Sequence, residues 1–253
     1  MEKTKIYYDK KQKLADPVLV VGLPGIGNVG SLVAEHIKNE LDGKKFAVLY
    51  SPYFPHQAIM QSDGGLRLVS NRFYHCKGKK GRSILVLVGD TQPATTRGQY
   101  SVNERIIKFY KSIGGKTIIT IGGYSAANQY VHNPKVYGVA NSAGFKKELE
   151  GKGIIFGKAA GSIYGAAGLI PAMAKRYGIK SACIMGETGL LEIDANAAKA
   201  VLAVLKDLLN IDIDFSNLDK IKKETEKIIK DIEEASKQQE GQYQSKDNLS
   251  YIR

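Results

Sequence analysis

The chain has 253 residues, of which 43% are hydrophobic and 25% are charged, and its formal net charge is +12. This length suffices for one large α/β domain with a full hydrophobic core, and the composition excludes disorder for most of the chain. No apolar run approaches the roughly 18 residues that a membrane span needs, and the charged start MEKTKIYYDKKQK has no secretory apolar stretch, so we expect a cytoplasmic protein without a membrane partner.

Apolar runs typical of buried strands alternate with amphipathic helical patterns along the chain. The predicted strands are 17–22, 45–50, 83–88, 117–121, 153–157 and 181–185, and the predicted helices are 28–41, 103–113, 166–176 and 195–209. This alternation favours a three-layer α/β sandwich with a largely parallel or mixed central sheet. Segments 53–73 and 124–139 are weakly periodic, and we expect loops with short strands there.

The segment VVGLPGIGNVG contains Gly25, Gly27 and Gly30 in the G-x-G-x-x-G spacing of a dinucleotide-binding turn. A strand precedes it and a helix follows, which suits an anion site. The next strand, however, ends in AVLYSP and lacks the acidic residue that holds a ribose. Pro24 also removes an N–H donor from the turn. The pattern therefore favours close strand-to-helix packing over nucleotide binding, and no cofactor is expected.

Two carboxylates follow predicted strands, Asp90 in VGDTQP and Glu187 in IMGETG. At the carboxyl edge of a sheet they would either serve as acid and base or cap helices and hold loops. An enzyme or binder of nucleoside-like ligands would use the crevice at that edge. Its candidate residues are Gly25, Gly27, Asp90, Gln92, Tyr124, Ser125 and Glu187.

Other reactive side chains show no catalytic or metal-binding pattern. Cys76 and Cys183 lie far apart without CxxC spacing, so we expect buried or half-buried thiols in a reducing compartment. The four histidines have no triad or ligand spacing, and Ser125 and Ser162 do not occupy a G-x-S-x-G turn. We expect neither a catalytic residue nor a metal.

The positive charge is confined to the first part of the chain. Residues 216–253 hold eight basic and eight acidic residues, so the excess lies in residues 1–215, scattered in clusters such as KGKKGR. Because basic and aromatic residues do not alternate along one element, nucleic acid is not the expected partner. A lysine-rich solvated surface, which would also suit an acidic protein partner, explains the pattern.

The carboxyl-terminal part has its own periodicity. Ser216 and Asp219 resemble a helix-capping box. Apolar or small residues then recur at alternating spacings of three and four: Leu218, Ile221, Thr225, Ile228, Ile232 and Ala235. This short coiled-coil seam would pack either on its own domain or between subunits. The sequence thus divides into an α/β core (1–215), an amphipathic helix (216–237) and an aperiodic, flexible tail (238–253).

Five blocks in order, GLPGIGNVG, VGDTQP, TIGGYSA, VYGVANS and GSIYGAAGLIPAMAKRYGIKSACIMGETG, resemble the archaeal and bacterial relatives of the second proteasome-assembly-chaperone family. The resemblance covers residues 16–209. It implies a fold similar to the nucleoside phosphorylase and hydrolase-like fold, and a non-enzymatic homo-oligomer that acts on proteasome α-subunits or the core particle, or on a second adaptor protein.

The resemblance also implies a role for the end of the chain, because some archaeal members end in hydrophobic-Tyr-X and dock that tail between α-ring subunits. Here the tyrosine is third from last, in Leu249-Ser250-Tyr251-Ile252-Arg253. Tyr251 and Ile252 are two apolar groups on a polar tail. The residues implied to contact a partner are Leu249, Tyr251, Ile252 and Arg253. The displaced tyrosine leaves ring opening, assembly and binding of a different partner as alternatives.

Overall fold

The computed structural model describes residues 3–9, 14–125, 130–157, 161–189, 191–224 and 227. The chain divides into two compact units, Met1–Asp214 and Phe215–Arg253. In the second unit, residues 216–224 and 227 are helical. The predicted seam beyond them and the predicted tail 238–253 lie outside the described residues, so the division into core, helix and tail stays a prediction.

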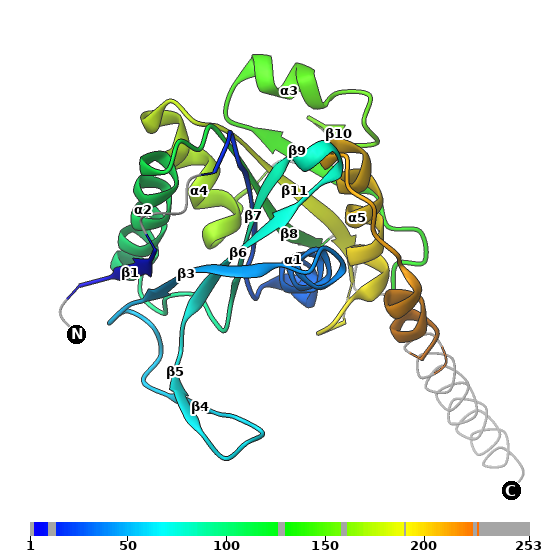
Figure 1. Cartoon of the computed structure of the whole chain (residues 1–253). Helices are drawn as coiled ribbons and strands as arrows, with labels where there is room; N and C mark the ends of the chain where they lie inside the picture. The colour runs from blue at the N-terminus through cyan, green and yellow to red at the C-terminus, as the bar shows by residue number, and fades with distance from the viewer. Residues whose placement is uncertain are drawn as a thin grey trace, which may run out of the picture. The chain divides into compact units, whose positions relative to one another are not determined.

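The first unit is built on a nine-stranded mixed sheet with the order β1-β3-β6-β7-β2-β8-β11-β9-β10 (Figure 1). Strands β2, β3, β7, β8 and β11 run in one direction and the others run opposite to them. The strands are β1 (Lys5–Tyr8), β2 (Val18–Gly22), β3 (Lys44–Tyr50), β6 (Asn71–Lys77), β7 (Ser83–Gly89), β8 (Thr117–Ser125), β9 (Val136–Ala140), β10 (Ile155–Phe156) and β11 (Lys180–Thr188). A separate hairpin pairs β4 (Ala58–Met60) with β5 (Leu66–Leu68).

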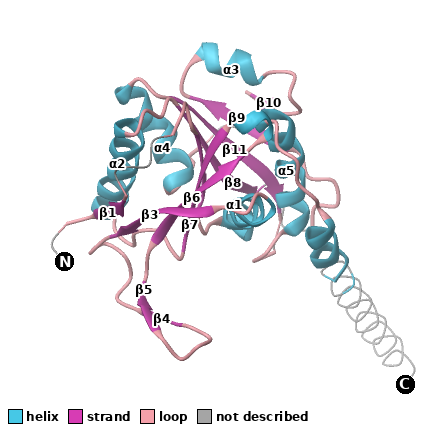
Figure 2. Ribbon diagram, in the orientation of Figure 1, coloured by secondary structure: helices cyan, strands magenta, loops and turns pink. Residues whose placement is uncertain are grey.

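Helices cover both faces of this sheet (Figure 2). They are α1 (Val29–Glu40), α2 (Thr96–Ser112), α3 (Ala143–Leu149), α4 (Ala166–Ala174) and α5 (Ala195–Leu209). Helices α1 and α5 pack together on one face, α2 and α4 pack together on the other, and α3 packs against β9 and β11. The predicted three-layer sandwich with a mixed central sheet is confirmed.

The central strands explain why the chain folds this way. All five residues of β2 are buried, as expected of a strand covered by helices on both faces. On the α2 side, the ring of Phe109 packs 5.0 Å from that of Phe73. The fully buried Tyr110 donates its hydroxyl to the carbonyl of Thr117 at 2.7 Å. This aromatic cluster fixes α2 against the sheet.

Both cysteines are buried, as the sequence predicts. Burial raises the pKa of the Cys76 and Cys183 thiols to about 12. Since the thiolate is the reactive form, both groups are inert at neutral pH. They fill the core.

Strand β1 and helix α3 were not predicted, and strands β6 and β9 extend beyond segments 53–73 and 124–139, where only loops with short strands were expected. Strand β6, NRFYHCK, is polar at several positions and is nevertheless paired on both sides, by β3 and β7. Helix α2 begins at Thr96 rather than at residue 103, because Thr95 caps it by accepting a hydrogen bond from the Gly98 N–H at 3.1 Å. The first turns of α2 are polar, so the apolar periodicity that predicts this helix begins only at residue 103.

Candidate functional site

The glycine-rich turn after β2 brings α1 close to the sheet. A Cβ on Gly22 would lie 2.0 Å from the Gly30 carbonyl oxygen, and a Cβ on Gly30 would lie 2.8 Å from the Ile121 carbonyl oxygen. At Gly25 the backbone is extended, with φ −171°, and the nearest atom to an added Cβ is 3.9 Å away. Gly22 and Gly30 therefore make the predicted close packing, and Gly25 does not.

A buried carboxylate ties this turn to β11 and α5. Gly27, at φ 60°, accepts a backbone hydrogen bond from Asp194 at 2.8 Å. The Asp194 carboxylate accepts a hydrogen bond from the Thr188 hydroxyl at 2.7 Å and caps α5 by accepting one from the Ala197 N–H at 2.9 Å. This network fixes the turn through hydrogen bonds within the protein.

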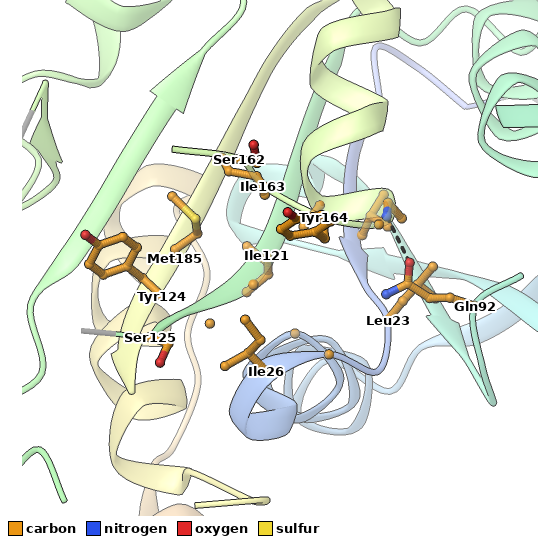
Figure 3. A pocket seen from close by; sticks show the side chains of 18 of the residues that line it. Leu23, Ile26, Gln92, Ile121, Tyr124, Ser125, Ser162, Ile163, Tyr164 and Met185 are labelled. Carbon is orange, nitrogen blue, oxygen red and sulfur yellow. Dashed lines mark hydrogen bonds between the residues drawn. The ribbon is translucent and has the colours of Figure 1, made fainter. Parts of the chain in front are cut away.

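A pocket of about 540 Å³ opens beside this turn, at the carboxyl ends of β2 and β8. The connection that leaves β2 passes through α1 on one face of the sheet, and the connection from β8 to β11 passes through α4 on the other face. Such a switch point is the usual place for a ligand site in an open α/β sheet. Figure 3 shows Ile26, Ile121 and Met185 around one space. The described lining residues are Val21, Leu23, Gly25, Ile26, Gly30, Gln92, Gln99, Ile121, Gly122, Gly123, Tyr124, Ser125, Val139, Gly161, Ser162, Ile163, Tyr164, Gly165, Ala166, Ala167 and Met185.

The chemistry of this lining is apolar and uncharged. None of the described lining residues is Asp, Glu, Lys, Arg or His. The polar groups at the walls are amides and the hydroxyls of serines and tyrosines. Such a surface suits an apolar, uncharged group, because a charge placed there would lose water without gaining a partner.

Gln92 braces the pocket wall. Its Nε2 donates to the Pro24 carbonyl at 2.7 Å, and its Oε1 accepts from the Ala166 N–H at 2.9 Å. Figure 3 shows this second bond reaching the start of α4. Gln92 therefore joins the glycine turn to α4, and both ends of its amide are already occupied within the protein.

The structure separates the predicted crevice residues into two sets. Gly25, Gln92, Tyr124 and Ser125 line the pocket. Gly27, Asp90 and Glu187 are not among its lining residues.

The two carboxylates of this second set are widely separated. Asp90 follows β7 and Glu187 lies in β11, with β2 and β8 between these strands. Three strand spacings place the two carboxylates about 14 Å apart. They do not form an acid–base pair.

Asp90 instead holds the loop that carries the β4–β5 hairpin. Its carboxylate accepts hydrogen bonds from Arg67 Nη2 at 2.9 Å, Arg72 Nη2 at 3.0 Å and the Ser70 N–H at 3.0 Å. Burial raises the pKa of Asp90, but the hydrogen bonds from Arg67, Arg72 and Ser70 outweigh this effect and lower the pKa to about 2. Asp90 is thus a structural anion, as one of the two sequence interpretations holds.

Replacing Asp90 by asparagine is expected to lower the free energy of unfolding by about 2–3 kcal/mol at neutral pH. Two guanidinium groups would lose their counter-ion, and breaking a buried pair costs several kcal/mol. Solvent compensates part of this cost, because the arginine side chains are partly exposed. Urea unfolding measures the change. The matched control is Asp212→Asn, whose exposed pairs with Lys79 and Lys206 are expected to contribute less than about 1 kcal/mol.

The same substitution has a defined pH dependence. Because the folded pKa of Asp90 lies below its ordinary value of 3.8, its stabilisation is present above that value and is lost as the pH falls through about 2. The difference between wild type and Asp90→Asn should therefore shrink towards zero near pH 2. An effect no larger than that of Asp212→Asn would contradict this assignment.

Glu187 also holds a loop. Its carboxylate accepts the Lys135 N–H at 3.0 Å, and its own N–H donates to the Lys135 carbonyl at 2.8 Å. This reciprocal pair fixes the entry to β9.

Several pocket residues escaped the sequence analysis, among them Ile26, Ile163, Tyr164 and Met185. For Ile26, Ile163 and Tyr164 the signal was a large apolar residue set among glycines, in GLPGIG and GSIYG. A glycine-rich turn at the surface does not need a large apolar side chain for its own folding. Such residues there therefore indicate a surface that binds something.

The predicted partner-binding residues Leu249, Tyr251, Ile252 and Arg253 lie outside the described part of the chain. Within that part, no helix has both the length and the apolar character that a membrane crossing requires. No cluster of three or more His, Cys, Asp or Glu side chains among the described residues is placed to hold a metal ion.

Comparison with protein families gives a match over most of the chain. The model of the PAC2 family matches residues 19–233. The uncharacterized protein MJ1210 of Methanocaldococcus jannaschii is 37% identical over 245 residues, which are 95% of this chain and 94% of that protein.

Solved structures agree with this match. PbaB of Pyrococcus furiosus, an archaeal proteasome activator, is 35% identical with a TM-score of 0.86, and the match covers 92% of this chain and 100% of PbaB. PbaA of the same organism, an archaeal homolog of proteasome-assembly chaperone, is 24% identical with a TM-score of 0.76 over 99% of this chain and 100% of PbaA, which shows the shared fold.

Proposed function

The chain belongs to the PAC2 family, and on that basis we propose that it is a non-enzymatic chaperone or adaptor of the proteasome. It acts as a cytoplasmic homo-oligomer on the core particle or its α-subunits, in an archaeal cell. The observation that carries this proposal is the match with the proteasome activator PbaB over nearly the whole of both chains.

The chemistry of the pocket supports a non-enzymatic role. The pocket at the sheet edge offers no ionisable acid or base among its described side chains, apart from tyrosines. General acid–base catalysis needs groups that change protonation near neutral pH. Asp90 and Glu187, the candidate acid and base for an enzyme on nucleoside-like substrates, form hydrogen bonds that hold loops.

The surface charge supports an acidic protein partner. The chain has 37 basic and 25 acidic residues, and the excess lies in residues 1–215. Such a field raises the rate of encounter with an acidic surface, and its effect falls with ionic strength. Charge therefore contributes to encounter, whereas specificity comes from apolar contacts.

The carboxyl-terminal residues Leu249, Tyr251, Ile252 and Arg253 provide those apolar contacts in this proposal. In this proposal the predicted amphipathic helix 216–237 holds the base of each tail. Several tails on one oligomer raise the overall affinity well above that of one tail, because each further contact is intramolecular. Tyr251 is third from last here, whereas the hydrophobic-Tyr-X order places tyrosine second from last. In this proposal that difference changes how the tail docks, and the apolar end of the tail still binds.

Native mass measurement of purified components tests this function. The chain mixed with core particle, or with α-subunits, is expected to give a new species whose mass is the sum of the chain's oligomer and its partner. Raised salt serves as the control, since binding by charge alone would be screened away. Masses that stay unchanged on mixing, at low and at physiological salt, would overturn the proposal.

A further inference from the structure

The β4–β5 hairpin carries an apolar face that is open to solvent. In this ribbon Ala58 pairs with Leu68 and Met60 pairs with Leu66, so these four side chains project from one face. Met60 is 84% exposed, Leu66 73% and Leu68 60%. The solvent face of a two-stranded ribbon is ordinarily polar. We call these four residues the hairpin face.

The opposite face of the hairpin fixes this orientation. Ile59 packs against the hydrophobic core, and Arg67 forms the ion pair with Asp90. The ends of the segment are fastened by Phe54 and Val69, both buried in the same core. The hairpin face therefore points outward because the other face is anchored, and a simple rotation of the ribbon would break these contacts.

The pocket offers a complementary surface on the same chain. It is apolar and uncharged, and large apolar side chains stand exposed at its lining, with Ile26 53% exposed and Tyr164 85% exposed. Figure 3 shows both around the space beside Ile121. Exposed apolar groups concentrated at one site are typical of an interaction surface.

The hairpin and the pocket lie at the same edge of the sheet. The hairpin is anchored by Asp90, directly after the carboxyl end of β7, and the pocket lies at the carboxyl ends of β2 and β8. These three strands are neighbours and run in parallel. A two-fold axis that passes midway between the hairpin and the pocket at this edge would place each hairpin over the pocket of the other copy, which is an isologous contact.

The distribution of charge favours a second copy of this chain as the partner that contacts the hairpin face and the pocket. Two chains that each carry +12 repel one another wherever their lysine-rich surfaces meet. An acidic partner would gain by meeting those lysines, whereas a second copy gains by avoiding them. The hairpin face and the described pocket lining contain no charged residue, which fits contact between like-charged chains.

We propose that the hairpin face of one copy docks on the pocket mouth of a second copy, and reciprocally. This contact builds the oligomer, and the inference rests on the homo-oligomer of the proposed function. Met60 and Leu66, at the end of the ribbon next to its turn, enter the partner's pocket between Ile26 and Tyr164.

The double variant Met60→Glu/Leu66→Glu tests the contact. Both side chains are exposed, so the fold should be kept, and a circular dichroism spectrum and melting curve check this. Sedimentation equilibrium is expected to give at least a 100-fold weaker self-association than wild type. The control Tyr100→Glu alters a side chain that is 52% exposed on α2, and its mass should equal that of wild type.

Cross-linking identifies the partner surface. Leu66→Cys and Tyr164→Cys chains are prepared separately, mixed and oxidised, so that a disulfide between the two variants joins different copies. We expect the mixed dimer to dominate over either self-linked dimer. The native cysteines are buried and should not interfere.

Each contrary result has its own meaning. A wild-type chain that stays monomeric at high concentration, an unchanged mass for Met60→Glu/Leu66→Glu, or cross-linking of Leu66→Cys mainly to itself would overturn the inference. An unchanged mass with lost capture of core particle would also overturn it, since the hairpin would then contact the proteasome. Capture of core particle by wild type is measured separately, which tests the chaperone or adaptor role apart from this contact. A monomeric wild-type chain would also contradict the homo-oligomer of the proposed function, whereas the other results leave that function standing.

Discussion

Replacing Gly22 by alanine is expected to destabilise the protein by about 3 kcal/mol or more. The added Cβ would lie 2.0 Å from the Gly30 carbonyl oxygen and 2.5 Å from the Ala34 Cβ, far inside contact distance. Neither the backbone of α1 nor a buried alanine can rotate away, so the helix must shift from the sheet. Overpacking of this kind costs about 1–3 kcal/mol and sometimes more.

The matched control is Gly25→Ala in the same turn. Its backbone is extended and the nearest neighbour of the new Cβ is 3.9 Å away, so the melting midpoint should stay within a degree or so of wild type. A loss of about 3 kcal/mol for Gly22→Ala corresponds to a fall of roughly 6–12 °C for a domain of this size. Thermal unfolding followed by circular dichroism compares the two.

This pair also separates the two interpretations of the turn. A phosphate cradle would depend on Gly25, the first glycine of the fingerprint, whereas close packing depends on Gly22, which lies outside it. Equal midpoints for the two variants, or a larger fall for Gly25→Ala, would contradict the packing account.

The central layer was predictable because its residues are apolar on both faces. Strands β2, β7 and β8 read as continuous apolar runs, and α1 repeats Val29, Val33 and Ile37 at helical spacing. Such patterns follow from burial alone.

The full length of β6 and the start of α2 depend on contacts with residues far away in the sequence, so the local sequence pattern did not predict them. Arg72 makes β6 look polar and solvent-exposed, but it is neutralised by Asp90 from the neighbouring strand end. The first turn of helix α2 contains Gly98, a weak helix former, because a Cβ there would come within 2.7 Å of Tyr53. Neither contact leaves a periodic signal in the local sequence.

The sequence predicted where the candidate site lies in the fold, but it did not predict all of the residues that line it. The carboxyl edge of the sheet follows from the order of strands and helices, and four of the seven predicted crevice residues line the pocket. The sequence pointed to Asp90 and Glu187 because carboxylates are reactive in many sites. Their hydrogen bonds to Arg67 and to the Lys135 backbone, which only the fold creates, assign them to loops.

Deleting residues 240–253 is expected to lower the affinity for the core particle by at least about 100-fold. In our account the apolar end of the tail makes the specific contact, and several tails act together on one oligomer, so removing all of them removes the avidity as well. The deleted segment contains two basic and two acidic residues, so the net charge stays at +12. Any loss therefore cannot come from weaker charge attraction.

Two controls accompany the deletion. The oligomer mass of the shortened chain must equal that of the same number of shortened subunits, which shows that only the tail is affected. The exchange Tyr251→Ile/Ile252→Tyr places tyrosine in the penultimate position. It is expected to strengthen binding if the tail docks as the hydrophobic-Tyr-X order implies.

The equilibrium dissociation constant for immobilised core particle, measured for the full chain and for the chain ending at residue 239, tests the central claim most directly. We predict that the full chain binds and that the shortened chain binds at least about 100-fold more weakly. Equal dissociation constants for the two chains, or no binding by either, would contradict the account.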